Sequence, residues 1–307
     1  MKKVVITGAT GAIGHALINC LIEQEIEVLV IIHKGSNRLD TIPDSPYVKR
    51  LFGELNELST IDVTEYAKDY EVFYHFAWDG GKYRQDFERN IQNVEFTLQS
   101  IELAKKLGCK KYIGAGSQAE YGIQSVPLSG KTIPLPKTAF GAAKLLAGVV
   151  GKKKAEELHI DYIWVRILSI YGPYDGMQTL VSSLIKDLLM GQSKKLSKCE
   201  QMWDFLYSDD AARAMKLIGE RGINGKVYTL GSGTARPLRE YVDIIHAYVN
   251  KEVTLQIGAI PYAADQIMYL CADISELTKD TGFKPEVTFD SGIEKTVQWM
   301  KSKESDT

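Results

Sequence analysis

The sequence predicts an α/β fold with a doubly wound parallel sheet and a smaller second lobe, and three observations support this. Short apolar runs alternate with helical patterns through the first half of the chain, which is typical of βαβ units. A glycine-rich turn follows the first of these runs. The length of 307 residues can bury a sizeable core, and 45% hydrophobic with 25% charged residues is ordinary for a globular protein.

Five apolar runs are predicted to be buried parallel strands because they are continuous rather than alternating. They span residues 4–6, 28–32, 72–76, 112–113 and 162–165. Apolar residues at three- and four-residue steps from Ile91 to Leu107 predict an amphipathic helix that ends at Gly108 and covers one face of the sheet. Near the carboxyl end, Ser291 and Glu294 have the spacing of a capping box at the start of a helix.

The character of the sequence changes after Arg166, where glycines and prolines separate shorter elements. We expect the boundary between the lobes near residue 168 for this reason. The first lobe then covers residues 1–167, completed by elements around 205–230, and the second lobe covers residues 168–307.

Composition and charge exclude several classes of protein. A net charge of −2 and a pI near 6.3 do not favour a nucleic-acid binder, and the basic run 152–154 is interpreted as a solvated helix face. No apolar stretch has the length of a membrane span or signal peptide. The four cysteines are far apart and lack zinc-ligand spacing, so no metal site is expected, and we expect a reducing cytoplasm.

The segment from Val4 to Gly14 combines a strand, a glycine turn and the start of a helix. Small residues let the backbone approach a pyrophosphate, whose charge is met by free N–H groups at the helix N-terminus. This context predicts a dinucleotide site of the Rossmann type. The expected contacts come from Gly8, Thr10, Gly11, Ala12, Ile13 and Gly14.

The end of the second strand bears on the choice of cofactor. An acidic residue there would accept from the ribose 2′-OH of NAD, whereas a cation accommodates the 2′-phosphate of NADP. The strand ends in His33 and Lys34 with no carboxylate, and Arg38 follows in the same loop. These three residues favour NADP, and NAD is the alternative.

Further motifs follow the glycine loop in a fixed order along nearly the whole chain. They are His75-Phe76-Ala77, Asn93-Val94, Ser117 with Tyr121-Gly122, the segment 166–173, Trp203-Asp204-Phe205 and Asp209-Asp210. Together they resemble the extended short-chain dehydrogenase/reductase family, whose members epimerise, dehydrate or reduce nucleotide-linked sugars. The resemblance implies a nicotinamide cofactor, a nucleotide-sugar substrate and a homodimer formed through the 91–107 helix. It also implies cofactor contacts at Glu54, Leu55, Phe76 and Ala77.

The family's catalytic pair is Tyr-x-x-x-Lys, and Lys144 aligns with the lysine while Phe140 stands in place of the tyrosine. The resemblance implies that Ser117 polarises the sugar carbonyl and that Lys144 orients the cofactor. The tyrosine would supply the proton, and a phenyl ring has none to give. Tyr121 and Tyr171 are conceivable substitutes, although packing is the favoured role for both.

Three interpretations of Phe140 compete. It is a Tyr→Phe change that disables an enzyme, a natural residue in an enzyme with another proton donor, or part of a binding protein without turnover. We favour the first, because the change removes one oxygen while Ser117 and Lys144 remain.

The choice of reaction depends on further residues. Dehydratases of the family carry acidic residues just after the Ser117 position, but Gln118-Ala119 stands here, and Glu120 is expected to face elsewhere, so dehydration is the third choice. A 4-epimerase keeps NAD and is the second choice. The segments 171–176 and 258–269 are similar to 4-ketoreductases that make deoxysugars, such as the CDP-abequose synthases, and this favours an NADP-dependent reductase.

The substrate lobe departs from the family pattern at two positions. Trp203 stands where an arginine often contacts the diphosphate, and Ser169 where an asparagine is common. Gln201 and Arg236 are alternative groups for the diphosphate. The expected substrate contacts are Ser117, Gln118, Ser169, Gln201, Trp203 and Arg236.

Overall fold

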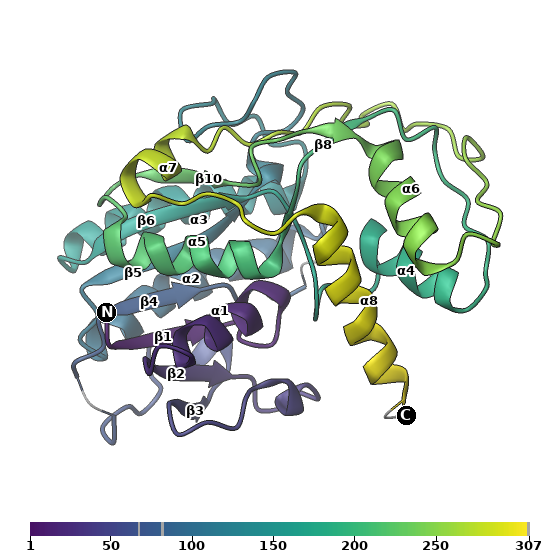
Figure 1. Cartoon of the computed structure of the whole chain (residues 1–307). Coiled ribbons are helices and arrows are strands. Elements are labelled where there is room, and N and C mark those ends of the chain that lie inside the picture. Colours follow the sequence, from purple (N-terminus) through teal and green to yellow (C-terminus); the bar gives the residue numbers. More distant parts are fainter. Residues whose placement is uncertain (67, 81–82, 306–307) are drawn as a thin grey trace.

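A seven-stranded sheet forms the centre of the computed structural model, which describes residues 1–66, 68–80 and 83–305 (Figure 1). All neighbouring strands run parallel, in the order β10-β6-β5-β4-β1-β2-β3. Their bounds are β1 (Lys3–Thr7), β2 (Glu27–Ile32), β3 (Val48–Phe52), β4 (Val72–His75), β5 (Lys111–Ser117), β6 (Asp161–Ile167) and β10 (Val227–Leu230). The predicted doubly wound α/β class is confirmed. The strand order reverses between β1 and β4, and ligands of such sheets bind beyond the carboxyl ends at this point.

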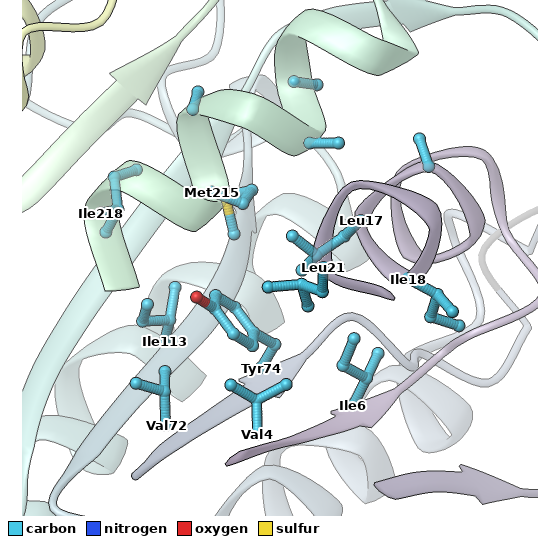
Figure 2. Close-up of a cluster of buried hydrophobic side chains, with 14 of the residues drawn as sticks. Val4, Ile6, Leu17, Ile18, Leu21, Val72, Tyr74, Ile113, Met215 and Ile218 are labelled. Atoms are coloured by element: carbon cyan, nitrogen blue, oxygen red, sulfur yellow. The ribbon is translucent and has the colours of Figure 1, made fainter. Parts of the chain in front are cut away.

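Helices cover both faces of the sheet. On one face, α1 (Ala12–Ile22) and α5 (Ser208–Arg221) lie side by side (Figure 1). Figure 2 shows the apolar side chains between these helices and the strands. They include Val4, Ile6, Leu17, Ile18, Leu21, Val72, Tyr74, Ile113, Met215 and Ile218, all fully buried or nearly so. Burial of each such leucine or isoleucine contributes about 1.5–3 kcal/mol, which fixes α1 and the glycine turn that precedes it.

The opposite face packs against α2 (Phe87–Lys106) and α3 (Ala139–Glu157). Its centre is a row of stacked rings from successive strands, with centroids 5.6, 5.6 and 6.2 Å apart. The row consists of Phe73, Tyr112, Tyr162 and Trp164. The predicted 91–107 helix is confirmed as α2, and it ends before Gly108, whose φ is +84°. On this face, α3 carries Phe140 and Lys144 and packs against β5, near its carboxyl end.

The smaller lobe contains α4 (Leu180–Leu189), α6 (Leu238–Val249) and α8 (Phe289–Ser305), at the right of Figure 1. These helices enclose a separate apolar cluster rich in aromatic rings. Two separate two-stranded pairings lie outside the central sheet: β7 (Ser169–Tyr171) with β9 (Phe205–Tyr207), and β8 (Met202–Trp203) with β11 (Arg236–Pro237). The short helix α7 (Ser275–Thr281) packs against α5 and β10 of the larger lobe. We propose the lobe division after residue 167, with α5 and β10 returning to complete the first lobe.

The helix α8 begins earlier than the sequence indicates. Its first residue is Phe289, so Ser291 lies inside the first turn, and the capping box predicted from Ser291 and Glu294 is wrong. The hydroxyl of Thr288 accepts instead from the backbone N–H of Ser291 at 3.3 Å. A threonine three residues upstream therefore takes the capping position, because it satisfies the same free N–H groups.

Among the helices that the structure describes, none is long and apolar enough to cross a membrane.

Candidate active site

The glycine turn after β1 is shaped for close approach of backbone groups. Gly8 has φ of +74°, and a side-chain carbon there would lie 2.7 Å from the Ala77 nitrogen at the end of β4. At Gly14 such a carbon would lie 2.3 Å from the Gly8 carbonyl oxygen, so helix α1 packs directly on the turn. Gly11 is different, because its nearest neighbour would be 3.7 Å away. Gly11 also begins α1 without a side-chain cap, which leaves N–H groups for an anion.

A cavity of about 670 Å³ lies beyond the carboxyl ends of β1, β2, β3 and β4. Nine of the predicted cofactor residues line it: Gly8, Thr10, Gly11, His33, Arg38, Glu54, Leu55, Phe76 and Ala77. Ala12, Ile13 and Gly14 do not line it, because they already belong to α1 or its packing. Lys34 does not line it either, since its ammonium pairs with Glu57 at 3.3 Å. The lining also includes Ser36, Asn56, Trp78, Asp79 and Phe96, which the sequence motifs do not identify.

A carboxylate reaches the end of β2 from the neighbouring strand. The Glu54 carboxylate pairs with His33 Nε2 at 2.9 Å and accepts from the Lys34 backbone N–H at 3.1 Å. Glu54 follows β3 in the sequence, and the pairing of β3 with β2 brings its carboxylate to the end of β2. The Arg38 guanidinium donates to the carbonyl oxygen of Tyr174 at 3.2 Å and lines the cavity.

Lys144 lies one helical turn from Phe140, as the spacing predicts, but its ammonium is enclosed. Nζ donates to the carbonyl oxygen of Ala115 at 2.7 Å and lies 3.8 Å from the centre of the Trp78 ring. Burial lowers the pKa of Lys144 to about 7, although the Glu120 charge opposes this. These contacts keep Lys144 out of the cavity lining, in which Trp78 takes part instead.

The Phe140 ring packs between one aromatic neighbour, Trp78, and one cationic neighbour, Arg84. The Phe140 ring meets the Trp78 ring edge to face, with centroids 5.8 Å apart. On another side, the guanidinium carbon of Arg84 lies 5.1 Å from the Phe140 ring centre. The Trp78 indole is held by a hydrogen bond from its Nε1 to Asn90 Oδ1 at 3.1 Å. The ring at position 140 is therefore packed, and its Lys144 neighbour lies 5.9 Å away.

Ser117 is held at the end of β5 by a local hydrogen-bond network. Its hydroxyl accepts from the Ala119 N–H at 3.2 Å, and its own N–H donates to the Glu120 carboxylate at 2.8 Å. Glu120 is fully buried and also accepts from Trp164 Nε1 at 3.0 Å and Arg166 Nε at 2.7 Å. The prediction that Glu120 faces away from the substrate is confirmed, so this carboxylate is not placed to remove a sugar proton.

The two tyrosines considered as substitutes for a residue-140 hydroxyl are engaged elsewhere. Tyr121 Oη donates to the Ser129 carbonyl oxygen at 2.8 Å and contacts the Thr229 hydroxyl at 2.8 Å. Tyr171 Oη donates to the Phe289 carbonyl oxygen at 3.2 Å. Burial raises the pKa of both phenols, so both are packing residues.

A second cavity, of about 350 Å³, opens between the lobes. Five predicted substrate residues line it: Ser117, Gln118, Ser169, Gln201 and Trp203. Arg236 does not, because it is exposed on β11, where it pairs with Trp203. Buried amide oxygens of Gln118 and Gln201 have no hydrogen-bond partner, which suits a ligand with hydroxyl groups. Residues that the motifs do not identify also line this cavity, among them Arg84, Asp175 and Gln266.

The Trp203-Asp204-Phe205 motif divides between the cavity and the lobe core. Trp203 Nε1 donates to the Ser169 hydroxyl at 2.8 Å, so these two departures from the family pattern contact each other. Asp204 is fully buried and accepts from the N–H groups of Ser232 and Ala272 at 2.8 and 3.0 Å. Burial raises the pKa of Asp204, and the carboxylate joins β8 to the loops behind it.

Comparison with known proteins adds to this geometry. The model of the NAD dependent epimerase/dehydratase family matches residues 4–231. The chain belongs to this family. The predicted resemblance to extended short-chain dehydrogenases/reductases is thereby confirmed.

The relatives with curated names include several that act on nucleotide sugars. The chain is 24% identical to CDP-abequose synthase of Salmonella muenchen over 96% of both chains. It is also 24% identical to dTDP-4-dehydro-6-deoxyglucose reductase of Escherichia coli over 98% of both chains. Among solved structures, UDP-glucuronic acid 4-epimerase of Bacillus cereus is similar, with a TM-score of 0.86, 22% identity, and coverage of 98% of this chain and 99% of that one. This last likeness shows the fold.

Proposed function

We propose that the protein is an NADP-dependent reductase of a nucleotide-linked 4-keto sugar, with its catalytic tyrosine position disabled by Phe140. The observation that carries this proposal is that Phe140, which lines neither cavity itself, contacts one residue of each. Phe140 contacts Trp78, which lines the cofactor cavity, and Arg84, which lines the substrate cavity beside Ser117. A hydroxyl added to the ring at this position would lie next to residues of both cavities, where a nicotinamide and a sugar are proposed to meet.

In this proposal NADPH, when bound, supplies a hydride to the sugar C4. The residues fit such a dinucleotide, because the glycine turn is open at Gly11 and α1 begins there without a side-chain cap. Ser117 donates its hydroxyl hydrogen to the carbonyl oxygen and so polarises the bond. Lys144 places an amine with a pKa of about 7 close to residue 140, where a tyrosine would pass a proton to the same oxygen.

Two alternative functions are each favoured by a particular residue. An NAD-dependent nucleotide-sugar 4-epimerase is favoured by Glu54, whose carboxylate stands near the end of β2. A non-catalytic protein that binds NADP and a nucleotide sugar is favoured by Phe140 itself. Reduction leads because Arg38 lines the cofactor cavity and because two 24% identical relatives are named as a deoxysugar synthase and a 4-keto sugar reductase.

The proposal is tested by incubating the protein with NADPH and 4-dehydro-6-deoxyglucose linked to dTDP, CDP or UDP. Slow, stoichiometric NADPH oxidation with formation of the 4-hydroxy sugar supports a reductase. Inversion at C4 of a nucleotide hexose with bound NAD, and no net NADPH oxidation, supports the epimerase instead. Binding of both ligands without either reaction, also after a hydroxyl is restored at position 140, supports the binding protein.

Arg38 is expected to determine the preference for NADPH. A charged hydrogen bond contributes about 1.5–3 kcal/mol, so Arg38→Ala should raise the Kd for NADPH about 10–100-fold. The Kd for NADH should change little, and titration calorimetry measures both. Lys34→Ala is the matched control, because Lys34 pairs with Glu57 outside the cavity. Equal losses for both cofactors, or none for NADPH, would contradict the assignment of NADP.

We also propose that two copies pair through α2 and α3. Four apolar side chains on the outer side of this helix pair are 41–70% exposed: Phe87, Ile91, Leu146 and Val149. A second copy would cover them in a four-helix contact. Val149→Lys should therefore convert a dimer to a monomer in sedimentation velocity, whereas the wild-type protein sediments as a dimer. A wild-type monomer at micromolar concentration would contradict this proposal.

A further inference from the structure

Arg84 belongs to the loop that joins β4 to α2, and this loop is attached to the start of α3. The Phe140 N–H donates to the Arg84 carbonyl oxygen at 2.9 Å. The Ala139 N–H donates to the side-chain oxygen of Gln85 at 3.4 Å. Free N–H groups of the first helical turn are thereby satisfied by the loop. The backbone of Arg84 is consequently fixed relative to position 140.

The Arg84 guanidinium has a different environment from its neighbour Arg89. Arg89 pairs with Asp79 at 3.5 Å and with Asp86 at 3.6 Å. Within the part of the chain that the structure describes, the Arg84 guanidinium has neither a carboxylate nor a hydrogen-bond acceptor, and it rests on the Phe140 ring. Arg84 is exposed although it lines the substrate cavity, and its guanidinium keeps its charge. A cation that lines a cavity and has no carboxylate partner attracts a ligand that carries or develops negative charge.

The position of Arg84 indicates which part of a ligand it meets. It lines the substrate cavity together with Ser117 and Gln118, on the side where residue 140 lies. Ser117 is the residue assigned to the sugar carbonyl. We therefore expect the guanidinium to meet the reacting end of the sugar and not the diphosphate. Among the described residues that line this cavity, Gln201 is the candidate for the diphosphate.

We propose that Arg84 contacts the substrate and donates hydrogen bonds to the reacting carbonyl oxygen, together with Ser117. The inference rests on the proposed reductase function. As the hydride forms the new C–H bond, the carbonyl π electrons move to oxygen. Arg84 and Ser117 hold the resulting alkoxide, a water molecule supplies its proton, and Arg84 keeps its own. This arrangement predicts slow reduction by a protein with Phe140.

The test compares Arg84→Gln with the unmodified chain, using the best-bound of the three nucleotide forms of 4-dehydro-6-deoxyglucose, labelled with carbon-13 at C4. Loss of one donor to an oxyanion lowers kcat by about 10²–10³, and we expect that loss with little change in KM. The carbonyl resonance of the bound sugar should move upfield, because the carbonyl is less polarised. Affinity for the free nucleoside diphosphate should stay the same. Arg84→Lys should recover part of kcat.

Lys137→Gln is the matched control, because it removes a positive charge from the exposed segment that leads into α3 and does not line the cavity. It should leave kcat and the resonance unchanged. Unchanged kcat and resonance in Arg84→Gln, with an unaltered thermal melting curve, would overturn the inference about Arg84 and leave the proposed reductase function in place. A selective loss of nucleoside diphosphate affinity would also overturn it, in favour of a diphosphate contact. If no form of the keto sugar binds the unmodified chain, the proposed function itself fails.

Discussion

Phe140→Tyr is expected to raise the rate of 4-keto sugar reduction by about 10²–10⁴, which is the contribution of a positioned general acid. Phe140 lies one helical turn before Lys144 on α3, and its ring is 9% exposed. The Arg84 guanidinium lies 5.1 Å from the ring centre, and the Lys144 amine, whose pKa of about 7 leaves it partly protonated at neutral pH, lies 5.9 Å away. Positive charges close to a phenol stabilise the phenolate and lower its pKa toward neutral pH. A tyrosine here would therefore be an activated proton donor.

The measurement is the rate of NADPH oxidation by the wild-type and variant proteins with the same keto sugar. Phe140→Leu serves as the control, because it removes the ring without adding a hydroxyl and should give no increase. The gain should appear in kcat more than in KM, since proton donation acts in the transition state. If Phe140→Tyr is no faster than the Phe140 protein on any substrate that is turned over, the account of a disabled reductase is wrong.

Most of the central sheet could be predicted because buried parallel strands appear as continuous apolar runs. The two strands at its edges could not. In β3, Lys49 and Arg50 interrupt the apolar pattern, since this edge strand is partly exposed. The four-residue strand β10 follows a glycine turn far along the chain, and only its pairing with β6 identifies it. Local patterns carry no information about such distant partners.

The cofactor side of the site could be predicted better than the substrate side. Backbone geometry at Gly8 and Gly14 is required by the turn, so the residue type itself is informative. Lys34, Lys144 and Arg236 are predicted to bind from motif position and residue type, and none of them lines the cavity expected for it. Tertiary partners decide where such long side chains point.

Trp78 and Arg84 are the residues that the motifs miss. Both lie in the connection between β4 and α2, whose path is set by contacts with α3 and with Asn90. The available signal was an aromatic residue directly after His75-Phe76-Ala77, at the carboxyl end of a central strand. Loops at this end of the sheet carry function in doubly wound folds, so polar and aromatic residues there merit assignment before the structure is known.

Glu120→Ala is expected to lower the free energy of unfolding by about 3–5 kcal/mol, because it leaves a buried arginine without its carboxylate. Glu120 is fully buried and Arg166 is 6% exposed. Their ion pair is 2.7 Å long, and the carboxylate also accepts from Trp164 and from the Ser117 N–H. One Nη atom of Arg166 already lacks a hydrogen-bond partner, so few groups could replace the lost carboxylate.

Urea unfolding of the single and double variants separates this structural role from a chemical one. Glu156→Ala is the control, since Glu156 pairs with Lys153 on an exposed helix face, where solvent screens the pair and its loss should change the stability little. The double variant Glu120→Leu with Arg166→Met should be much more stable than Glu120→Ala, because neither charge is then left buried and unpaired. A loss below about 1 kcal/mol in Glu120→Ala would mean that water or another group reaches Arg166, which would contradict the buried ion pair.

If Glu120→Gln instead kept its stability and abolished loss of water from a nucleotide hexose, Glu120 would be a catalytic acid, and dehydration would replace reduction as the leading reaction.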